Sequence, residues 1–149
     1  MKIQSFLMLL LLSLLIGCDS FYPKANFHLI NFSKDKPTTD ITVKFGGDVI
    51  YSGPLHRSTV APDIQYTFSK RALKGKYNII IEADGGRIKE SHPLMLGKDK
   101  WVIIRYSYLK PVDSATLLRV YGFVDSARLT GSGPKITVGV RNEPIKEYY

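Results

Sequence analysis

The stretch KYNIIIEADGGRIKESHPLML, residues 76–96, decides the fold class of this chain. Tyr77, Ile79 and Ile81 recur at every second position, which is the period of a strand with one buried face. The Asp-Gly-Gly sequence at 84–86 supplies a turn in which positive φ angles cost little, and a second strand pattern follows it. The stretch therefore predicts a β-hairpin.

The same plan recurs upstream in ITVKFGGDVIYSG, residues 41–53, where Ile41, Val43 and Phe45 alternate with polar residues before a Gly-Gly-Asp turn. Further strands are expected in NFHLINFS (26–33), IQYTFS (64–69), KWVIIRYSYL (100–109), LLRVYGFV (117–124) and KITVGVRN (135–142). Turn signals recur about every ten residues, and none of these stretches shows helical periodicity over three turns. We expect an all-β fold, a single antiparallel β-sandwich of roughly seven to nine strands.

Two strands carry a positional signal as well. Pro93 cannot donate a ladder hydrogen bond, so we expect it at a bulge or at a sheet edge. Residues 100–109 are apolar on both faces at their start, which is typical of a central strand.

LKGKYNIIIEADGG, residues 73–86, resembles the G-K-Y-x-I-x-I-E-A-x-G stretch of extracytoplasmic immunoglobulin-like and transthyretin-like sandwich modules. Residues 41–53 similarly resemble the x-V-x-x-x-G-x-x-V-Y-x-G hairpin of such modules. The resemblance implies an immunoglobulin-like or transthyretin-like sandwich, and modules of this kind bind, space or scaffold. A fold alone does not define a function.

The N-terminal segment has the profile of a signal peptide. Lys2 precedes an apolar stretch from Phe6 to Ile16, which is followed by the small residue Gly17 and by Cys18. A transmembrane helix needs about twenty apolar residues, and this stretch is little more than half that length. We therefore expect a removable leader rather than a membrane span.

LIGC, from Leu15 to Cys18, resembles the lipobox of bacterial lipoproteins. The resemblance implies that the Cys18 thiol is linked to diacylglycerol and that the leader is cut between Gly17 and Cys18. The new amino group is often acylated too, with palmitate as the expected chain, and Asp19 resembles the inner-membrane retention signal of enteric-type bacteria. The alternative is a secretory signal cut elsewhere, which would leave a free cysteine.

These signals divide the chain into a signal peptide (1–17), a lipidated cysteine with its tether (18–25) and a β-sandwich domain (26–149). Cys18 is the single cysteine, so after lipidation no thiol is left for a disulfide, a metal or catalysis. The location is then the bacterial cell envelope, on the periplasmic face of the inner membrane or on the outer membrane.

The chain is basic, with 21 Lys and Arg against 13 Asp and Glu. An exported protein meets anionic lipid or cell-wall polymers rather than nucleic acid. The segment KRALKGK concentrates this charge in one strand-to-strand connection and makes it a candidate contact for an anionic surface through Lys70, Arg71, Lys74 and Lys76. The alternative is a solubilising connection that touches nothing.

Aromatic and arginine side chains gather late in the chain. They form a candidate platform for a glycan or protein ligand, because aromatic rings combine apolar area with polar tips. Sheet packing is the alternative role for the same residues, which are Trp101, Arg105, Tyr106, Tyr108, Arg119 and Tyr121.

Signals for catalysis and cofactors are weak. His28, His56 and His92 are far apart without metal-ligand spacing, so we expect neither a metal nor a cofactor. Ser132 in Gly-Ser-Gly lacks the nucleophile-elbow context and reads as a loop, and the Glu82 and Asp84 carboxylates beside the turn are expected to be solvated.

We therefore expect a lipid-anchored envelope protein with no enzymatic activity, a binding or assembly module whose partner is anionic lipid, a wall polymer or another envelope protein. The alternative is an exported hydrolase, which would need a nucleophile, a base and an orienting group that converge in a cleft.

Overall fold

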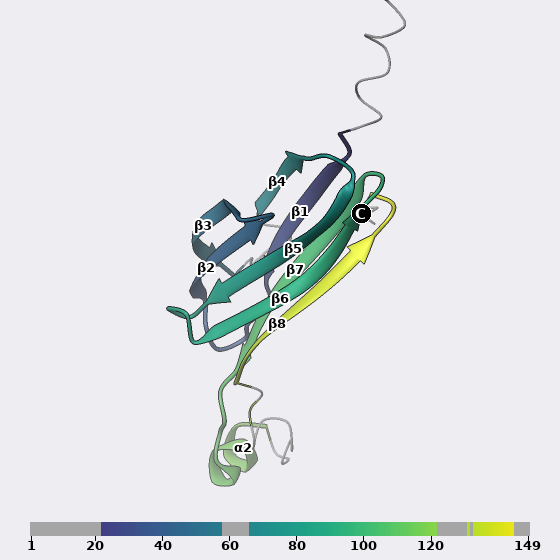
Figure 1. Ribbon diagram of the computed structural model, residues 1–149. Coiled ribbons are helices and arrows are strands. Elements are labelled where there is room, and N and C mark those ends of the chain that lie inside the picture. The colour runs from purple at the N-terminus through teal and green to yellow at the C-terminus, as the bar shows by residue number, and fades with distance from the viewer. Residues whose placement is uncertain (1–21, 58–65, 122–130, 132, 145–149) are drawn as a thin grey trace, which may run out of the picture.

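The computed structural model describes residues 22–57, 66–121, 131 and 133–144, and within these ranges eight strands form two four-stranded sheets that pack face to face (Figure 1). One sheet has the order β4-β1-β7-β8, with β1 at Lys24–Asn31, β4 at Tyr66–Arg71, β7 at Lys100–Leu109 and β8 at Gly133–Arg141. The other has the order β3-β2-β5-β6, with β2 at Thr38–Phe45, β3 at Asp48–His56, β5 at Gly75–Ala83 and β6 at Ile88–Leu96. The predicted all-β sandwich is confirmed.

Both hairpins form at the predicted turns. Gly46 and Gly47 have φ angles of 60° and 96°, and the three residues at 84–86 have φ angles of 56°, 65° and 83°. Glycine adopts this left-handed region at no steric cost, and aspartate tolerates it better than most residues. Pro93 lies in the edge strand β6, and β7 lies inside its sheet, as the sequence predicts.

Inward-facing residues of both sheets fill one core. The alternating residues Phe27 and Leu29 of β1 and Ile79 and Ile81 of β5 are fully buried. Burying an aliphatic or aromatic side chain of this size stabilises the fold by about 1.5–3 kcal/mol. Among the described residues, the members of the buried cluster all lie between Ala25 and Ile136.

One pairing departs from the antiparallel expectation, because β1 pairs with β7 in parallel, with Ala25 opposite Lys100 and Asn31 opposite Tyr106. Parallel neighbours require a crossover connection rather than a tight turn. The chain between β1 and β7 supplies this crossover by building the whole of the second sheet and the edge strand β4.

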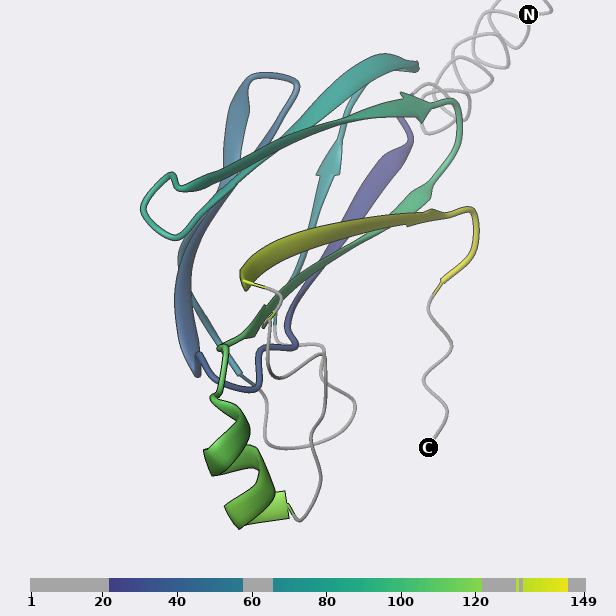
Figure 2. The ribbon, with the colours of Figure 1, turned by 90° about the horizontal axis from the view of Figure 1, so that it is seen from below.

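The strand predicted at 117–124 is wrong, since this part of the chain begins inside helix α2, Ser114–Tyr121, which lies beyond the end of β7 and outside the sandwich (Figure 2). The Asp113 carboxylate accepts a hydrogen bond from the Thr116 backbone N–H at 2.9 Å and caps the first turn. Leu118 and Val120 of this helix are more than half exposed, so burial on a sheet does not impose a strand here.

The sandwich begins only a few residues after Cys18 in the sequence. β1 starts at Lys24, within the segment assigned to the tether, and the Ala72 backbone N–H donates to the Pro23 carbonyl at 3.2 Å. Cys18, Gly17 and Asp19 lie outside the described residues. In the ranges that are described, no helix has the length and apolar character needed to cross a membrane.

Candidate functional site

The four basic residues of KRALKGK occupy the connection between β4 and β5. Lys70 and Arg71 end β4, Lys74 lies in the loop and Lys76 belongs to β5, and all four are exposed. The Lys70 Nζ lies 3.2 Å from the Asp48 carboxylate, a surface pair that adds little stability. The sequence-based expectation of a projecting basic connection agrees with this placement.

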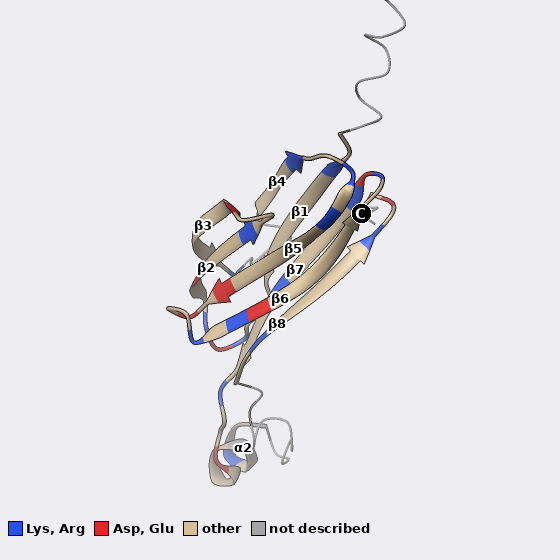
Figure 3. Cartoon of the chain, in the orientation of Figure 1, with Lys and Arg blue, Asp and Glu red and all other residues tan. Residues whose placement is uncertain are grey.

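The strand order brings further positive charge to the same end of the sandwich. The starts of β1 and β7 and the ends of β4, β6 and β8 all meet there, and Figure 3 shows Lys and Arg gathered at this end. The additional basic residues are Lys24, Lys98, Lys100 and Arg141. We call these four, together with the four of KRALKGK, the basic end.

The candidate aromatic platform is divided among several places. Tyr106 is fully buried in the core and offers no surface to a ligand, while its neighbour Arg105 is exposed on the opposite face of β7. Tyr108 packs against the core beside Tyr106, whereas Trp101 is half-buried at the start of β7. Arg119 lies on α2, away from the sheets, and the side chain of Tyr121 is outside the described set.

The buried Tyr106 hydroxyl belongs to a polar cluster that connects the two sheets. Tyr106 Oη donates to Asp84 Oδ2 at 2.8 Å, and Thr39 Oγ1 donates to Asp84 Oδ1 at 2.6 Å. The Lys36 ammonium also pairs with Oδ1. Asp84 follows β5, Thr39 belongs to β2 and Tyr106 belongs to β7, so one carboxylate contacts both sheets.

The environment of this cluster shifts two pKa values in opposite directions. Burial alone would raise the pKa of Asp84, but the hydrogen bonds from Lys36, Thr39 and Tyr106 outweigh it and hold this pKa below its usual value. Burial and then the Asp84 carboxylate raise the pKa of Tyr106. At neutral pH the pair is therefore a carboxylate that accepts from a neutral phenol.

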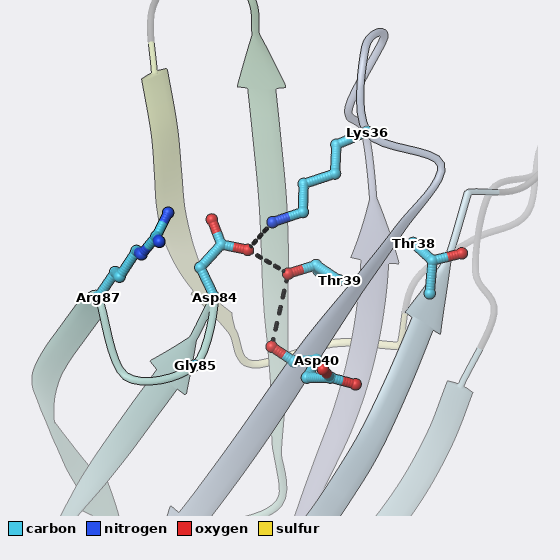
Figure 4. Close-up of a pocket in the computed structure, with 7 residues that line it drawn as sticks. All are labelled: Lys36, Thr38, Thr39, Asp40, Asp84, Gly85 and Arg87. Atoms are coloured by element: carbon cyan, nitrogen blue, oxygen red, sulfur yellow. Dashed lines mark hydrogen bonds and ion pairs between the residues drawn. The ribbon is translucent and has the colours of Figure 1, made fainter.

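A polar pocket with a volume of about 410 Å³ opens beside this carboxylate (Figure 4). Lys36 and Asp84 approach each other in the pocket, and Arg87 extends along the other side of Asp84. Its described lining residues include no serine, cysteine or histidine; they are Lys36, Thr38, Thr39, Asp40, Asp84, Gly85 and Arg87. The Asp84 carboxylate in this pocket already pairs with Lys36 and accepts hydrogen bonds from Thr39 and Tyr106.

The expectation that Asp84 is solvated is wrong, because only 7% of its side chain is exposed. Glu82 is closer to that expectation, with 27% exposed and pairs to Lys44 and Lys89. An aspartate in a positive-φ turn position was visible in the sequence, but its donors are 48, 45 and 22 residues away along the chain. Their convergence follows from the sheet order, which local patterns do not determine.

The three histidines lie on different strands. The side chain of His28 on β1 contacts Thr67, that of His56 on β3 contacts Thr38, and that of His92 on β6 pairs with Glu90. Within the described part of the chain, no three His, Cys, Asp or Glu side chains are grouped as a metal site would require. Ser132 lies outside that part.

Comparisons with protein-family models, with curated proteins and with solved structures find no match to this chain. Its function therefore has to be inferred from its own residues.

Proposed function

We propose that this chain is a lipoprotein of the bacterial cell envelope, in which diacylglycerol on Cys18 anchors a β-sandwich that serves as a non-catalytic binding or assembly module. The observation that carries the proposal is LIGC at the end of the apolar leader, followed after a short tether by the first strand of the sandwich. Only a thiolate is nucleophilic enough for the alkylation that lipidation requires, and Cys18 is the single cysteine.

The anchor would be strong enough to define where the protein resides. Each buried methylene contributes about 0.8 kcal/mol, so one long acyl chain contributes roughly 10 kcal/mol. Two or three chains on one cysteine hold a domain at a bilayer almost irreversibly. Asp19 favours the inner membrane, facing the periplasm, if the host follows the enteric rule.

A binding module is favoured over an exported hydrolase by the chemistry of the polar pocket. A hydrolase needs a nucleophile and a base within hydrogen-bond reach of each other. The pocket is instead lined by Thr38, Thr39 and the basic side chains of Lys36 and Arg87 around Asp84. The Asp84 oxygens already accept from Thr39 and Tyr106 and pair with Lys36. The modules that residues 73–86 resemble bind, space or scaffold rather than catalyse.

The test is mass spectrometry of the protein purified from membranes of a bacterial host. We expect a chain that begins at Cys18 and carries the added mass of diacylglycerol, with or without an N-acyl chain. The Cys18→Ser variant should remain unmodified and keep its leader. Ser20→Ala, two residues after Cys18, is the matched control and should be processed like the native chain.

An unmodified Cys18 in the native protein would contradict the anchor. The binding role is tested separately, by cross-linking in intact cells followed by solubilisation of the membranes. A partner that is retained by the native protein and lost from Cys18→Ser would identify what the module binds at the membrane. Turnover of ester, peptide or glycan substrates by the purified protein would favour the hydrolase instead.

A further inference from the structure

We infer that the basic end of the sandwich docks on the anionic phospholipid headgroups of the membrane that holds the anchor, with Leu73 entering the interfacial layer. The inference rests on the proposed function, because it takes Cys18 as the point of attachment. It names the partner of the basic connection and adds residues that only the fold brings to it.

The first step is the length of the tether. Lys24, where β1 starts, is six positions after Cys18, and an extended chain spans about 3.3 Å per residue. The start of β1 is therefore held within about 20 Å of the lipid. The basic end lies at this start, so it is the part of the sandwich held nearest to the bilayer (Figures 1 and 3).

The second step is the balance of charge at this end. Lys24, Lys98, Lys100 and Arg141 join the four basic residues of the β4–β5 connection. Among the described residues, the acidic side chains of the same end are Asp48, Asp99 and Glu143. The Asp99 carboxylate already accepts from the Lys24 backbone N–H at 2.8 Å, and Asp48 pairs with Lys70. A clear excess of positive charge faces the membrane.

The third step is the apolar residue at the centre of this charge. Leu73 lies between Arg71 and Lys74, and 57% of it is exposed. The Tyr77 hydroxyl donates to the Leu73 carbonyl at 2.8 Å, which fixes the connection to β5. Tyr22, in the tether two residues before β1, is 46% exposed. Leucine and tyrosine beside lysine and arginine are the combination that partitions into a bilayer interface.

This combination favours phospholipid over an acidic wall polymer. A polymer would use the charge of the basic end but would gain nothing from an exposed leucine. An anionic bilayer uses both, and each basic residue near its surface strengthens partitioning about fivefold. The effect decays within about 10 Å at moderate salt, a separation that the tether allows the domain to close.

The experiment uses residues 19–149 without lipid, since every member of the buried core in the described part of the chain lies between Ala25 and Ile136. Co-sedimentation is measured with phosphatidylcholine vesicles and with vesicles that also contain phosphatidylglycerol. We expect binding to the anionic vesicles alone, weakened by salt. Replacing Lys70, Arg71, Lys74 and Lys76 by Gln should lower the partition coefficient by about two to three orders of magnitude.

The matched control removes the same charge from the opposite end of the sandwich. Lys34, Arg87, Lys110 and Lys135 are exposed there, and replacing them by Gln should change the partition coefficient by less than about threefold. Equal losses in the two variants would show a nonspecific charge effect and would overturn the assignment of the basic end.

Insertion of the leucine is measured with a polarity-sensitive dye. Leu73→Cys supplies the single thiol in residues 19–149, and the labelled chain should show a blue shift on anionic vesicles. Leu118→Cys on α2, at a site that is 53% exposed, should show none. Binding to polyglutamate as strong as binding to vesicles, without a shift at residue 73, would assign the charge to a polymer and overturn the inference. These chains carry no lipid, so the outcome is independent of the mass spectrum that tests Cys18.

Discussion

Asp84 is the residue on which the two sheets depend most directly. Its carboxylate accepts from Thr39 of one sheet and from Tyr106 of the other, and it pairs with Lys36 from the loop after β1. A buried charge is costly unless hydrogen bonds satisfy it, and here the bond of each partner is weakened if the charge is removed. The cluster therefore connects the two sheets, and its hydrogen bonds depend on the protonation state of Asp84.

We expect Asp84→Asn to lower the free energy of unfolding at neutral pH by about 2 to 3 kcal/mol, because it weakens charge-assisted hydrogen bonds to a largely buried group. Chemical denaturation measures this loss. Glu82→Gln, near the end of β5, is the matched control, because its pairs to Lys44 and Lys89 are partly exposed and should contribute little. In a double-mutant cycle, Tyr106→Phe should cost less in the Asp84→Asn background than in the native chain.

The pH dependence of stability, compared between the native chain and Asp84→Asn, tests the role of this carboxylate independently. The pKa of Asp84 is lowered in the folded state, so its contribution is complete above the unfolded pKa of about 4 and is lost as pH falls through the folded pKa. The native chain should therefore lose stability in acid more steeply than Asp84→Asn, and the two should converge at low pH. A constant difference down to low pH would contradict the role assigned to the carboxylate.

At the scale of elements, the strands were predictable because the alternation of buried residues is a local signal. Alternating apolar residues indicate the buried face of a strand, as in the pairs Phe27 and Leu29 or Ile41 and Val43. All four are buried in the structure. Helix α2 was missed because a short apolar run such as 117–120 fits a strand or a helix equally well. The capping residue Asp113 before Ser114 was the signal that could have identified it.

The basic end was likewise predictable only in part from local sequence. Four basic residues close together are visible in the sequence, and the structure exposes all four at the end of β4, in the loop and at the start of β5. The remaining residues of the basic end depend on β1 pairing with β7 and on β8 closing the sheet, which local patterns do not encode. For the same reason the sequence did not show that Tyr106 faces the core while Arg105 faces solvent.

The cap of α2 gives a prediction at this scale. Both Asp113 oxygens accept from Thr116, one from the backbone N–H at 2.9 Å and one from the hydroxyl at 2.7 Å. Asp113→Ala should reduce the helical chemical shifts of residues 114–121 in NMR spectra. The unfolding midpoint of the sandwich should hardly move, because none of the α2 side chains that the structure describes belongs to the buried core cluster.

Ser114→Ala is the control for this helix, since it changes the next residue and leaves the cap in place. Lowering the pH should act like Asp113→Ala, because the hydrogen bonds from Thr116 hold the pKa of Asp113 below its usual value and protonation removes a charged acceptor. Helical shifts that persist in Asp113→Ala would show that packing rather than the cap maintains α2.

The whole molecule is organised by long-range pairing and has two distinct ends. The basic end carries the start of β1, and α2 lies at the opposite end of the sandwich (Figure 1). β1 pairs with β7, so Asn26 lies in register with Trp101 although 75 positions separate them in the sequence. β8 then places Arg141 on the other side of Trp101. The sheet is therefore complete only after almost the whole domain has been brought together.

This topology predicts slow and cooperative folding, and the single tryptophan reports it. Closing long loops before any contact compensates the entropy makes sandwiches fold in milliseconds to seconds. Trp101 fluorescence and far-ultraviolet circular dichroism should therefore give coincident denaturation curves and one main refolding phase in this range, apart from proline-limited phases of tens of seconds. Trp101→Phe should keep the circular dichroism kinetics. A fluorescence change much faster than strand formation would show that β7 is buried before β1 arrives, and would contradict assembly of this sheet as one unit.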